Sequence, residues 1–212
     1  MKKTAQSIIE KHMANGVIFV DPFLTFIDDE VEIGHGVEIA PFVCLSGNTK
    51  IGNGSVIGIF SNISDSVIGE NVEISNSTIE ESEIEENVKI GPYSHLRPGC
   101  YICAGAKIGN FSELKNTKIG KNSNVCHLGY LGDSEIGENV NIGAGTITCN
   151  FDGTKKHKTT IGDDAFIGSS TVIIAPKTIG KNAFTGAGSI ITKDVESDTL
   201  VYGNPAKERA KK

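Results

Sequence analysis

Aliphatic residues recur at every sixth position along most of this chain. The first clear run of the ladder comprises Ile33, Ile39, Leu45, Ile51, Ile57 and Ile63. A glycine often follows the aliphatic residue, as in Ile51-Gly52, and a small residue often stands four positions after it, as Ser55 does. A period of six fits neither an α-helix nor a simple alternating strand. It predicts a solenoid in which each unit supplies one short strand and one corner.

Three such units complete one coil of a triangular prism. The aliphatic residue of each unit points into the prism, and the glycine relieves steric crowding at the corner. Stacked coils then form three parallel sheets whose strands lie about 4.8 Å apart. Between Ile33 and Val195 there is room for about nine coils at this repeat length. We therefore predict an all-β protein, with a parallel β-helix over residues 31–195.

The ladder is interrupted in two different ways. Its spacing slips from six residues to five at several points, for example between Ile63 and Ile68, which predicts shorter corners. A longer break in the ladder lies between Thr148 and Ile161. This stretch is polar and contains an Asp-Gly pair. This break predicts a loop at residues 149–160 that leaves the prism, and loops on rigid scaffolds commonly carry function.

Both ends of the chain depart from the repeat. Residues 4–14 have a helical pattern that Asn15-Gly16 would end, and we assign residues 1–30 to this helix and a lead-in. Such a helix could cover the unpaired strand edge of the first coil. Residues 196–212 are expected to form a turn-rich exit and a basic tail, with solvated disorder from Lys207 onward.

Composition excludes several functional classes. The chain has 25 glycines, no tryptophan and a net charge of −6, so its core depends on small aliphatic contacts and nucleic acid is not an expected partner. No apolar run approaches the ~20 residues that span a membrane, so no membrane association is expected. Five scattered cysteines, an odd number, fit reduced thiols. We expect a cytoplasmic protein.

Two of the cysteines, Cys100 and Cys103, form a C-x-x-C pattern. A structural zinc site needs about four ligands, and no second pair of Cys or His at ligand spacing accompanies this one. We interpret both as small packing residues, and the sequence predicts no metal site.

Polar residues that break the repeat are densest between residues 96 and 156. The run from residue 127 to residue 153 begins His-Leu-Gly-Tyr-Leu-Gly-Asp and ends Thr-Cys-Asn-Phe-Asp-Gly. It closely resembles the acetyltransferase domain of the bifunctional N-acetylglucosamine-1-phosphate uridyltransferase and glucosamine-1-phosphate acetyltransferase. The resemblance extends from Asp21 to about Asp194. It implies a left-handed β-helix, acetyl-CoA as co-substrate, a role in making UDP-N-acetylglucosamine for the cell wall, and a homotrimer with three chains at each site.

The resemblance also implies a role for individual residues. His127 matches the general base, and an imidazole with a pKa near 6.5 suits removal of a proton from an amine at neutral pH. Residues matching those that bind the sugar phosphate are Arg97, Lys115, Tyr130, Asn141 and Lys156. Residues matching those that contact coenzyme A are Ala144, Asn150, Phe151, Ser169 and Ala187, and a further candidate is Lys207. Phe151 stands where the family often has Tyr.

The implied reaction is direct transfer without an acyl-enzyme and without a metal. The free amine attacks the acetyl carbonyl, His127 accepts the proton, and coenzyme A leaves. Cys126 beside His127 could suggest a thiol nucleophile. Because neighbours in a strand point to opposite faces, we disfavour this alternative.

Two departures from the family leave the acceptor open. Nothing in the chain resembles the uridyltransferase domain, so a separate uridyltransferase could supply that step. The C-terminal run Gly203-Asn204-Pro205-Ala206-Lys207 resembles the ending of general hexapeptide O-acetyltransferases. Glucosamine-1-phosphate is the preferred acceptor, and another amino sugar, a nucleotide sugar or a hydroxyl acceptor is the alternative. Two other classes are a metal hydratase, which would need about three His at an interface, and a non-catalytic trimeric scaffold.

Overall fold

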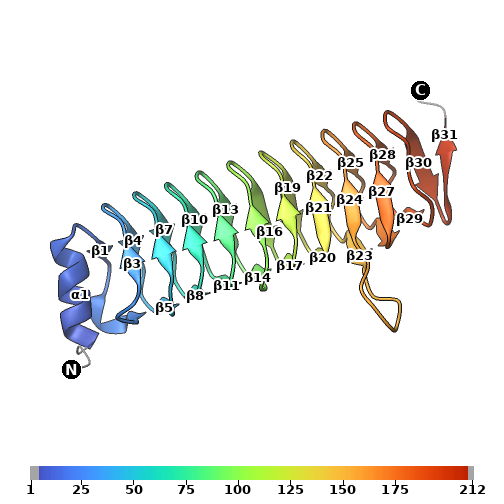
Figure 1. The fold of residues 1–212 in the computed structure, drawn as a ribbon. Helices are drawn as coiled ribbons and strands as arrows, with labels where there is room; N and C mark the ends of the chain where they lie inside the picture. The colour runs from blue at the N-terminus through green and yellow to red at the C-terminus, as the bar shows by residue number, and fades with distance from the viewer. Residues whose placement is uncertain (1–4, 210–212) are drawn as a thin grey trace.

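The computed structural model describes residues 5–209 as a straight three-sided rod of stacked coils (Figure 1). Each coil contributes one strand to each of three parallel sheets, here called A, B and C. Sheet A contains β1 (Ile18–Phe19), β4 (Glu38–Ile39), β7 (Val56–Ile57), β10 (Glu73–Ile74), β13 (Lys89–Ile90), β16 (Lys107–Asn110), β19 (Asn124–His127), β22 (Asn141–Ile142), β25 (Phe166–Ile167), β28 (Phe184–Thr185), β30 (Leu200–Gly203) and β31 (Ala206–Arg209).

Sheets B and C complete the prism. Sheet B contains β2 (Phe26–Ile27), β5 (Cys44–Ser46), β8 (Asn62–Ser64), β11 (Thr78–Glu80), β14 (His95–Leu96), β17 (Glu113–Lys115), β20 (Tyr130–Gly132), β23 (Ile147–Cys149), β26 (Val172–Ile174) and β29 (Ile190–Ile191). Sheet C contains β3 (Glu32–Ile33), β6 (Lys50–Ile51), β9 (Val67–Ile68), β12 (Glu83–Ile84), β15 (Tyr101–Ile102), β18 (Lys118–Ile119), β21 (Ser134–Ile136), β24 (Thr159–Ile161) and β27 (Lys177–Ile179).

The aliphatic ladder forms the core, as the period of six predicts. Ile57, Ile63 and Ile68 come from the three sheets of one coil, and each is at most 2% exposed. Residues of the ladder lie in register from coil to coil, as Ile63 does with Leu45 and Ile79. The core is therefore a column of stacked aliphatic side chains that holds the outward-facing residues at a fixed spacing.

The corners between sheets follow a regular backbone pattern. In the five-residue units, one residue with positive φ turns the chain from sheet B to sheet C, as Asp65 (φ 46°), Asn116 (φ 48°) and Asp133 (φ 49°) do. The slips in the aliphatic ladder are thus shortened corners. Asn and Asp tolerate this conformation because their short polar side chains bond locally.

At the N-terminal end, α1 (Ala5–Ala14) lies across the first coil and buries Ile8 and Ile9. The helix agrees with the predicted span, except that residue 4 lies outside the described residues. The sheets begin earlier than residue 31, because β1 pairs with β4 and β2 pairs with β5. The stretch after the helix therefore supplies strands of the first coil, not only a lead-in.

At the C-terminal end, β30 continues sheet A beside β28, and β31 folds back antiparallel on β30. The expectation of disorder from Lys207 is therefore wrong for Lys207–Arg209, which form part of a strand. The paired backbone groups of this hairpin explain the difference. Residues 210–212 of the predicted tail lie outside the described residues.

Between β23 and β24 the chain leaves the prism as a long loop (Figure 1, orange). An antiparallel bridge between Phe151 and Lys156 closes it on itself. The projecting loop predicted from the polar break is thus present over residues 150–158. Within residues 5–209, no helix is long and apolar enough to cross a membrane.

Candidate functional site

Several of the candidate residues share one edge of the prism, the corner at which sheet A turns into sheet B. His127, Ala144, Ser169 and Ala187 each precede the positive-φ residue of their corner. Backbone hydrogen bonds connect successive corners: Gly145 donates to the carbonyl of His127, Ser170 to that of Ala144 and Gly188 to that of Ser169. These four residues therefore form a straight line, one coil apart, and at about 4.8 Å per coil the line is about 14 Å long.

His127 lies at the start of this line and is exposed to solvent. It ends β19, in register with Asn110 at the end of β16. Val125 of the same strand is buried in the core, and Cys126 between them is half-buried. Asn141 lies on the outer side of sheet A in the next coil, in register with Asn124. An exposed imidazole at a fixed corner can exchange a proton with a bound molecule.

A second group of candidates lies at the opposite edge of sheet B, where it turns into sheet C. Arg97 follows β14, and its amide donates to the carbonyl of Leu114, which places it beside Lys115 on the next coil. Arg97 is partly neutralised, because its Nη1 lies 3.0 Å from Oε1 of Glu113. Lys156 reaches the same corner from the projecting loop. Its contact with Lys115, its charge and the charge of Arg97 together lower the pKa of the Lys115 ammonium.

This crowding of cations indicates a site for an anion. Like charges held close together destabilise one another. A phosphate group would relieve that repulsion, because it supplies negative charge and several acceptor oxygens. We call Arg97, Lys115 and Lys156 the basic cluster.

Gly132 stands in register with Lys115 on the next coil and leaves a space beside the basic cluster. A methyl group at Gly132 would lie 2.5 Å from the hydroxyl oxygen of Tyr130 and 2.5 Å from Nδ2 of Asn150. Both polar groups therefore reach into the space that the missing side chain leaves. Asn150 is 6% exposed, so its amide is held in place by its surroundings.

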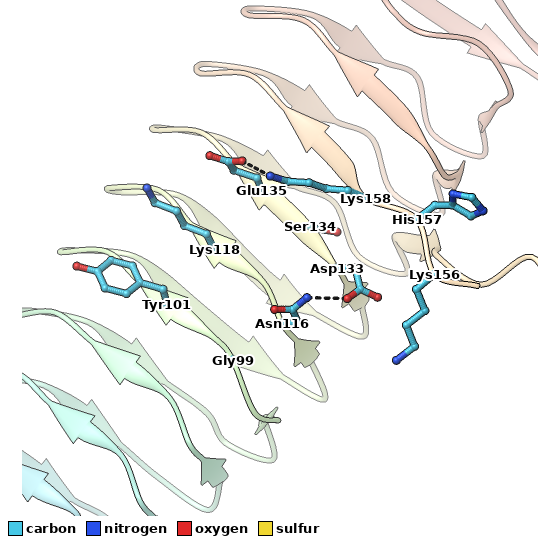
Figure 2. A pocket seen from close by; sticks show the side chains of 10 residues that line it. All are labelled: Gly99, Tyr101, Asn116, Lys118, Asp133, Ser134, Glu135, Lys156, His157 and Lys158. Atoms are coloured by element: carbon cyan, nitrogen blue, oxygen red, sulfur yellow. Dashed lines mark hydrogen bonds and ion pairs between the residues drawn. The ribbon is translucent and has the colours of Figure 1, made fainter. Parts of the chain in front are cut away.

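The same corner borders a cavity of 490 Å³ on the sheet C side. Figure 2 shows Asp133 pointing toward Asn116 there, with Lys156 at the edge nearest the loop. On its far side the Lys158 ammonium lies 2.5 Å from Glu135. The phenol of Tyr101 donates to Glu85 at 2.6 Å, which raises the pKa of Tyr101 to about 12. A phenol held in this way remains protonated at neutral pH.

The projecting loop is stiffened by one carboxylate. Oδ1 of Asp152 accepts hydrogen bonds from the amides of Thr154 and Lys155, both at 2.8 Å, and Oδ2 lies 2.6 Å from Nε2 of His157. These contacts, the first of them with His157, lower the pKa of Asp152 to about 2. Phe151 is 59% exposed on this loop. The loop therefore presents Phe151 and Lys156 from a defined turn.

The predicted site residues fall into two groups that sheet B separates. His127, Asn141, Ala144, Ser169 and Ala187 lie at or beside the A–B corner. Arg97, Lys115, Tyr130, Asn150, Phe151 and Lys156 lie on sheet B or at the B–C corner. Asn141, expected to bind the sugar, is thus with the line at the A–B corner, and Asn150 and Phe151, expected to contact coenzyme A, are with the basic cluster. One chain alone does not bring the two groups together.

Lys207 lies apart from both groups. It is exposed on β31, in register with Tyr202 of β30. The hairpin continues sheet A beyond β28, whose chain leads directly to Ala187 at the corner. Lys207 therefore lies two strands beyond β28, on the C-terminal side of the line.

Three charged residues of the site escaped sequence reasoning. Glu113 pairs with Arg97, Asp152 organises the loop, and Asp133 binds two asparagine amides. Asp133 and Asp152 stand inside the run from residue 127 to residue 153, and each precedes or follows a glycine. The partners of Asp152 are within its own loop. Those of Glu113 and Asp133 belong to other coils and could not be read from spacing.

The cysteines of the C-x-x-C pattern are both buried, Cys100 at 3% and Cys103 at 8% exposure. Burial raises the pKa of both thiols, which makes them less reactive. Within residues 5–209, no three His, Cys, Asp or Glu side chains are grouped as metal ligands.

Comparison with known proteins gives three consistent results. Residues 81–116 and 158–193 match the family described as bacterial transferase hexapeptide (six repeats). The chain is 54% identical over 198 residues to the bifunctional protein GlmU of Fervidobacterium nodosum, covering 93% of this chain and 44% of that protein. It is 52% identical over 202 residues to the GlmU of Thermosipho africanus, covering 95% and 45%. The chain thus spans less than half the length of these relatives.

Solved structures share the fold. The UDP-N-acetylglucosamine acyltransferase of Arabidopsis superposes with a TM-score of 0.70 at 20% identity, covering 88% of this chain and 72% of that one. The enzyme of the same name from Francisella novicida gives 0.60 at 21% identity, covering 91% and 70%. The chain therefore contains bacterial hexapeptide repeats, folds as a left-handed parallel β-helix, and is homologous to part of the bifunctional GlmU proteins.

Proposed function

We propose that this protein is an acetyl-CoA-dependent N-acetyltransferase that converts glucosamine-1-phosphate into N-acetylglucosamine-1-phosphate. The observation that carries the proposal is the basic cluster beside Tyr130 and Asn150. It offers charge for a phosphate next to neutral hydrogen-bonding groups for a sugar. Relatives at 54% and 52% identity that are named GlmU support an activity of this type.

In the proposed reaction, the amine of the acceptor attacks the acetyl carbonyl carbon of acetyl-CoA. A carbon–nitrogen bond forms, the carbon–sulfur bond breaks, and coenzyme A leaves as a thiolate. His127 accepts the proton from the attacking nitrogen and can return it to the thiolate. The backbone amide of Ala144, one coil beyond His127, is proposed to stabilise the negative charge on the carbonyl oxygen.

The line at the A–B corner supports an extended position for the co-substrate. Ser169 and Ala187 are exposed and continue the line from His127 toward the C-terminal hairpin. We propose that the chain of acetyl-CoA runs along this line, with its thioester at His127 and its nucleotide end toward Lys207.

A complete site then requires a second chain. If sheet B of each chain faces a three-fold axis, the A–B corner of one chain adjoins the B–C corner of its neighbour. His127 of one chain would then face the basic cluster of the next. We therefore propose a homotrimer, in agreement with the closed symmetry that most oligomers adopt.

An apolar ridge on the A–B corner supports this arrangement. Phe42 and Phe60 occupy two successive corners there, and Tyr93, Phe111 and Leu128 occupy three more, with exposures from 44% to 63%. The corner between the two sets is turned by Asn76. We call these five residues the corner ridge. All have φ between 46° and 61°, a conformation that is costly for large side chains by about 1–2 kcal/mol each. Contact with a neighbouring chain would bury them and offset that cost.

The remaining parts of the proposal concern the setting of the reaction. Transfer of a uridylyl group to the product is assigned to residues outside this chain, because the relatives are bifunctional and more than twice as long. The free cysteines among the described residues and the use of acetyl-CoA favour the cytoplasm as the site of the reaction.

A second candidate is an acetyltransferase with a different acceptor. The C-terminal hairpin that carries Lys207 favours it, since this ending is similar to that of general hexapeptide O-acetyltransferases. Such an enzyme would use the same line at the A–B corner, and another amino sugar, a nucleotide sugar or a hydroxyl compound would occupy the basic cluster.

The test is release of coenzyme A from acetyl-CoA with glucosamine-1-phosphate, measured beside His127→Ala. Turnover by the wild-type protein and its loss in the variant are expected. Turnover with glucosamine or UDP-glucosamine but not with glucosamine-1-phosphate would replace the acceptor. If no acceptor releases coenzyme A and acetyl-CoA does not raise the melting temperature, the protein is a scaffold without this activity.

A further inference from the structure

Asp133 is bound to two asparagine side chains from neighbouring coils. Its Oδ1 accepts a hydrogen bond from Nδ2 of Asn116 at 2.7 Å, and its Oδ2 accepts one from Nδ2 of Asn150 at 2.6 Å. Figure 2 shows the bond to Asn116 at the edge of the cavity. Both oxygens of the carboxylate are thus occupied by amide donors, and such charge-assisted hydrogen bonds are stronger than neutral ones.

The backbone fixes Asp133 between two coils. It turns the B–C corner with φ 49°, its amide donates to the carbonyl of Lys115 at 2.9 Å, and its own carbonyl accepts from Thr159 at 3.1 Å. The carboxylate therefore has little freedom to move away from the asparagines. This rigidity matters because an amide can otherwise rotate by half a turn and exchange its oxygen and nitrogen.

Asn150 is the partner with a consequence for the site. Its amide nitrogen reaches the space above Gly132, where the hydroxyl of Tyr130 also lies. With Nδ2 turned toward a carboxylate, the amide oxygen of Asn150 must point away from Asp133. Asp133 therefore determines which way the amide nitrogen and the amide oxygen of Asn150 face at the proposed sugar site.

We propose that Asp133 is a positioning residue that fixes the amide of Asn150 for the acceptor sugar. The inference rests on the proposed acetyltransferase function, which it deepens by assigning a residue that sets the orientation of the acceptor. Asp133 touches neither reacting group in this scheme and acts through Asn150.

A different role for Asp133 predicts different kinetics. Its carboxylate is close enough to Lys115 to oppose the fall of the lysine pKa. If it served only to balance the basic cluster, Asp133→Asn would strengthen binding of an anionic acceptor, lower KM and leave kcat unchanged. A positioning role predicts a fall in kcat instead.

Asp133→Asn keeps the shape of the side chain but leaves it one acceptor oxygen for two amide donors. We expect kcat with glucosamine-1-phosphate to fall roughly ten- to hundredfold, the scale of a lost charge-assisted hydrogen bond. The matched control is Asp65→Asn. Asp65 turns the same kind of corner with φ 46° and accepts a hydrogen bond from the backbone amide of Asn48 at 2.9 Å, but it lies four coils away. It should leave kcat within about twofold.

A double-mutant cycle tests whether Asp133 acts through Asn150. In the Asn150→Ala background, Asp133→Asn should reduce kcat by less than about twofold further, because the partner is already gone. A full additional loss in that background, or a change confined to KM, would overturn the proposal.

A second readout does not depend on turnover. In full-length protein labelled with ¹⁵N-asparagine, the side-chain amide of Asn150 should exchange slowly with water, and Asp133→Asn should remove that protection while Asp65→Asn should not. An unprotected amide in the wild type would refute the contact. If the wild type does not acetylate glucosamine-1-phosphate, the proposed function fails, whereas this measurement still decides whether Asp133 orients Asn150.

Discussion

The hydroxyl of Tyr130 and the amide nitrogen of Asn150 converge on one point above Gly132, each 2.5 Å from where a methyl group on that glycine would be. Tyr130 comes from β20, and Asn150 begins the projecting loop. Gly132 is therefore required by the site, since Tyr130 and Asn150 use the space that a side chain at this position would fill.

Gly132→Ala should impair the site without unfolding the chain. The three atoms nearest to the added methyl group belong to the side chains of Tyr130 and Asn150 and not to the backbone. We therefore expect these two side chains to be displaced, kcat/KM for the acceptor to fall at least about tenfold, and the melting temperature to fall less than in a variant whose backbone must move. The matched control is Gly120→Ala, whose methyl group would lie 2.3 Å from the carbonyl oxygen of Gly137. Because backbone must move there, that variant should lose at least about 1 kcal/mol of unfolding free energy. Thermal melts and steady-state rates would separate the two, and equal loss of stability in both would contradict this reading.

The lowered pKa of Lys115 predicts how acceptor binding depends on pH. A phosphate is bound by the charged form of the lysine, so KM should rise as the pH increases through the Lys115 pKa. Lys156→Gln removes the contact and the charge that lower this pKa most. The rise in KM should then begin at a higher pH, although KM at neutral pH is itself larger. Lys118→Gln, on the other side of the cavity, should leave the profile in place, and a shift as large as that of Lys156→Gln would refute the assignment.

The corner ridge predicts a mutational route to the monomer. Phe111 is 56% exposed and stacks on Tyr93 with ring centroids 5.3 Å apart. Phe111→Asp should place a charge in the proposed interface, shift the mass in solution from three chains to one, and abolish turnover. Phe23→Asp is the control, because Phe23 is 87% exposed outside the ridge. Light scattering would check both, and a Phe111→Asp variant that stays trimeric would rule out the ridge as the interface.

Asp152 should govern how the loop resists proteolysis. Asp152→Asn weakens its contacts with Thr154, Lys155 and His157, so trypsin should cut the loop several-fold faster after Lys155, Lys156 or Lys158. Asp194→Asn is the control, since Asp194 lies outside the loop and accepts a hydrogen bond from the backbone amide of Thr178.

The depressed pKa of Asp152 sets the pH range of this effect. A carboxyl group whose pKa falls from 3.8 to about 2 on folding stabilises the folded loop above the higher value and loses that contribution as the pH falls through the lower one. Trypsin resistance should therefore not vary through Asp152 between neutral and mildly alkaline pH. A ratio of cutting rates between Asp152→Asn and the wild type that changes within that range would contradict the assignment.

The fold could be predicted because it repeats. The same spacing recurs in every coil, so the position of Ile63 or Ile102 inside the prism is supported by the equivalent residues of all the other coils. The slips in spacing likewise became short corners at Asp65 and Asn116. At the two ends the period gives no such support. The strands β1, β2, β30 and β31 were missed there because they have few neighbours in the sequence pattern.

The site was predicted only as a set of residues, not as an arrangement. The spacing of the repeat could not show that His127 and Lys115 lie at opposite edges of sheet B, because it does not tell which corner of the prism each residue adjoins. The partners of Asp133 are each 17 residues away and belong to different coils. A contact of this kind depends on which corner a residue occupies, and the shortened corners change that count.

The straight line from His127 to Ala187 has a consequence for how this protein can change over time. A point mutation can alter the side chain at one corner, but the distance between successive corners is set by the sheets and not by the side chains. Inserting or deleting a complete coil would shift the far end by about 4.8 Å and preserve every register. A smaller change has to be absorbed at a corner, as in the five-residue units, or in a loop outside the prism, and leaves the number of coils unchanged. The length of this line can therefore change during evolution only by whole coils, in increments of about 4.8 Å.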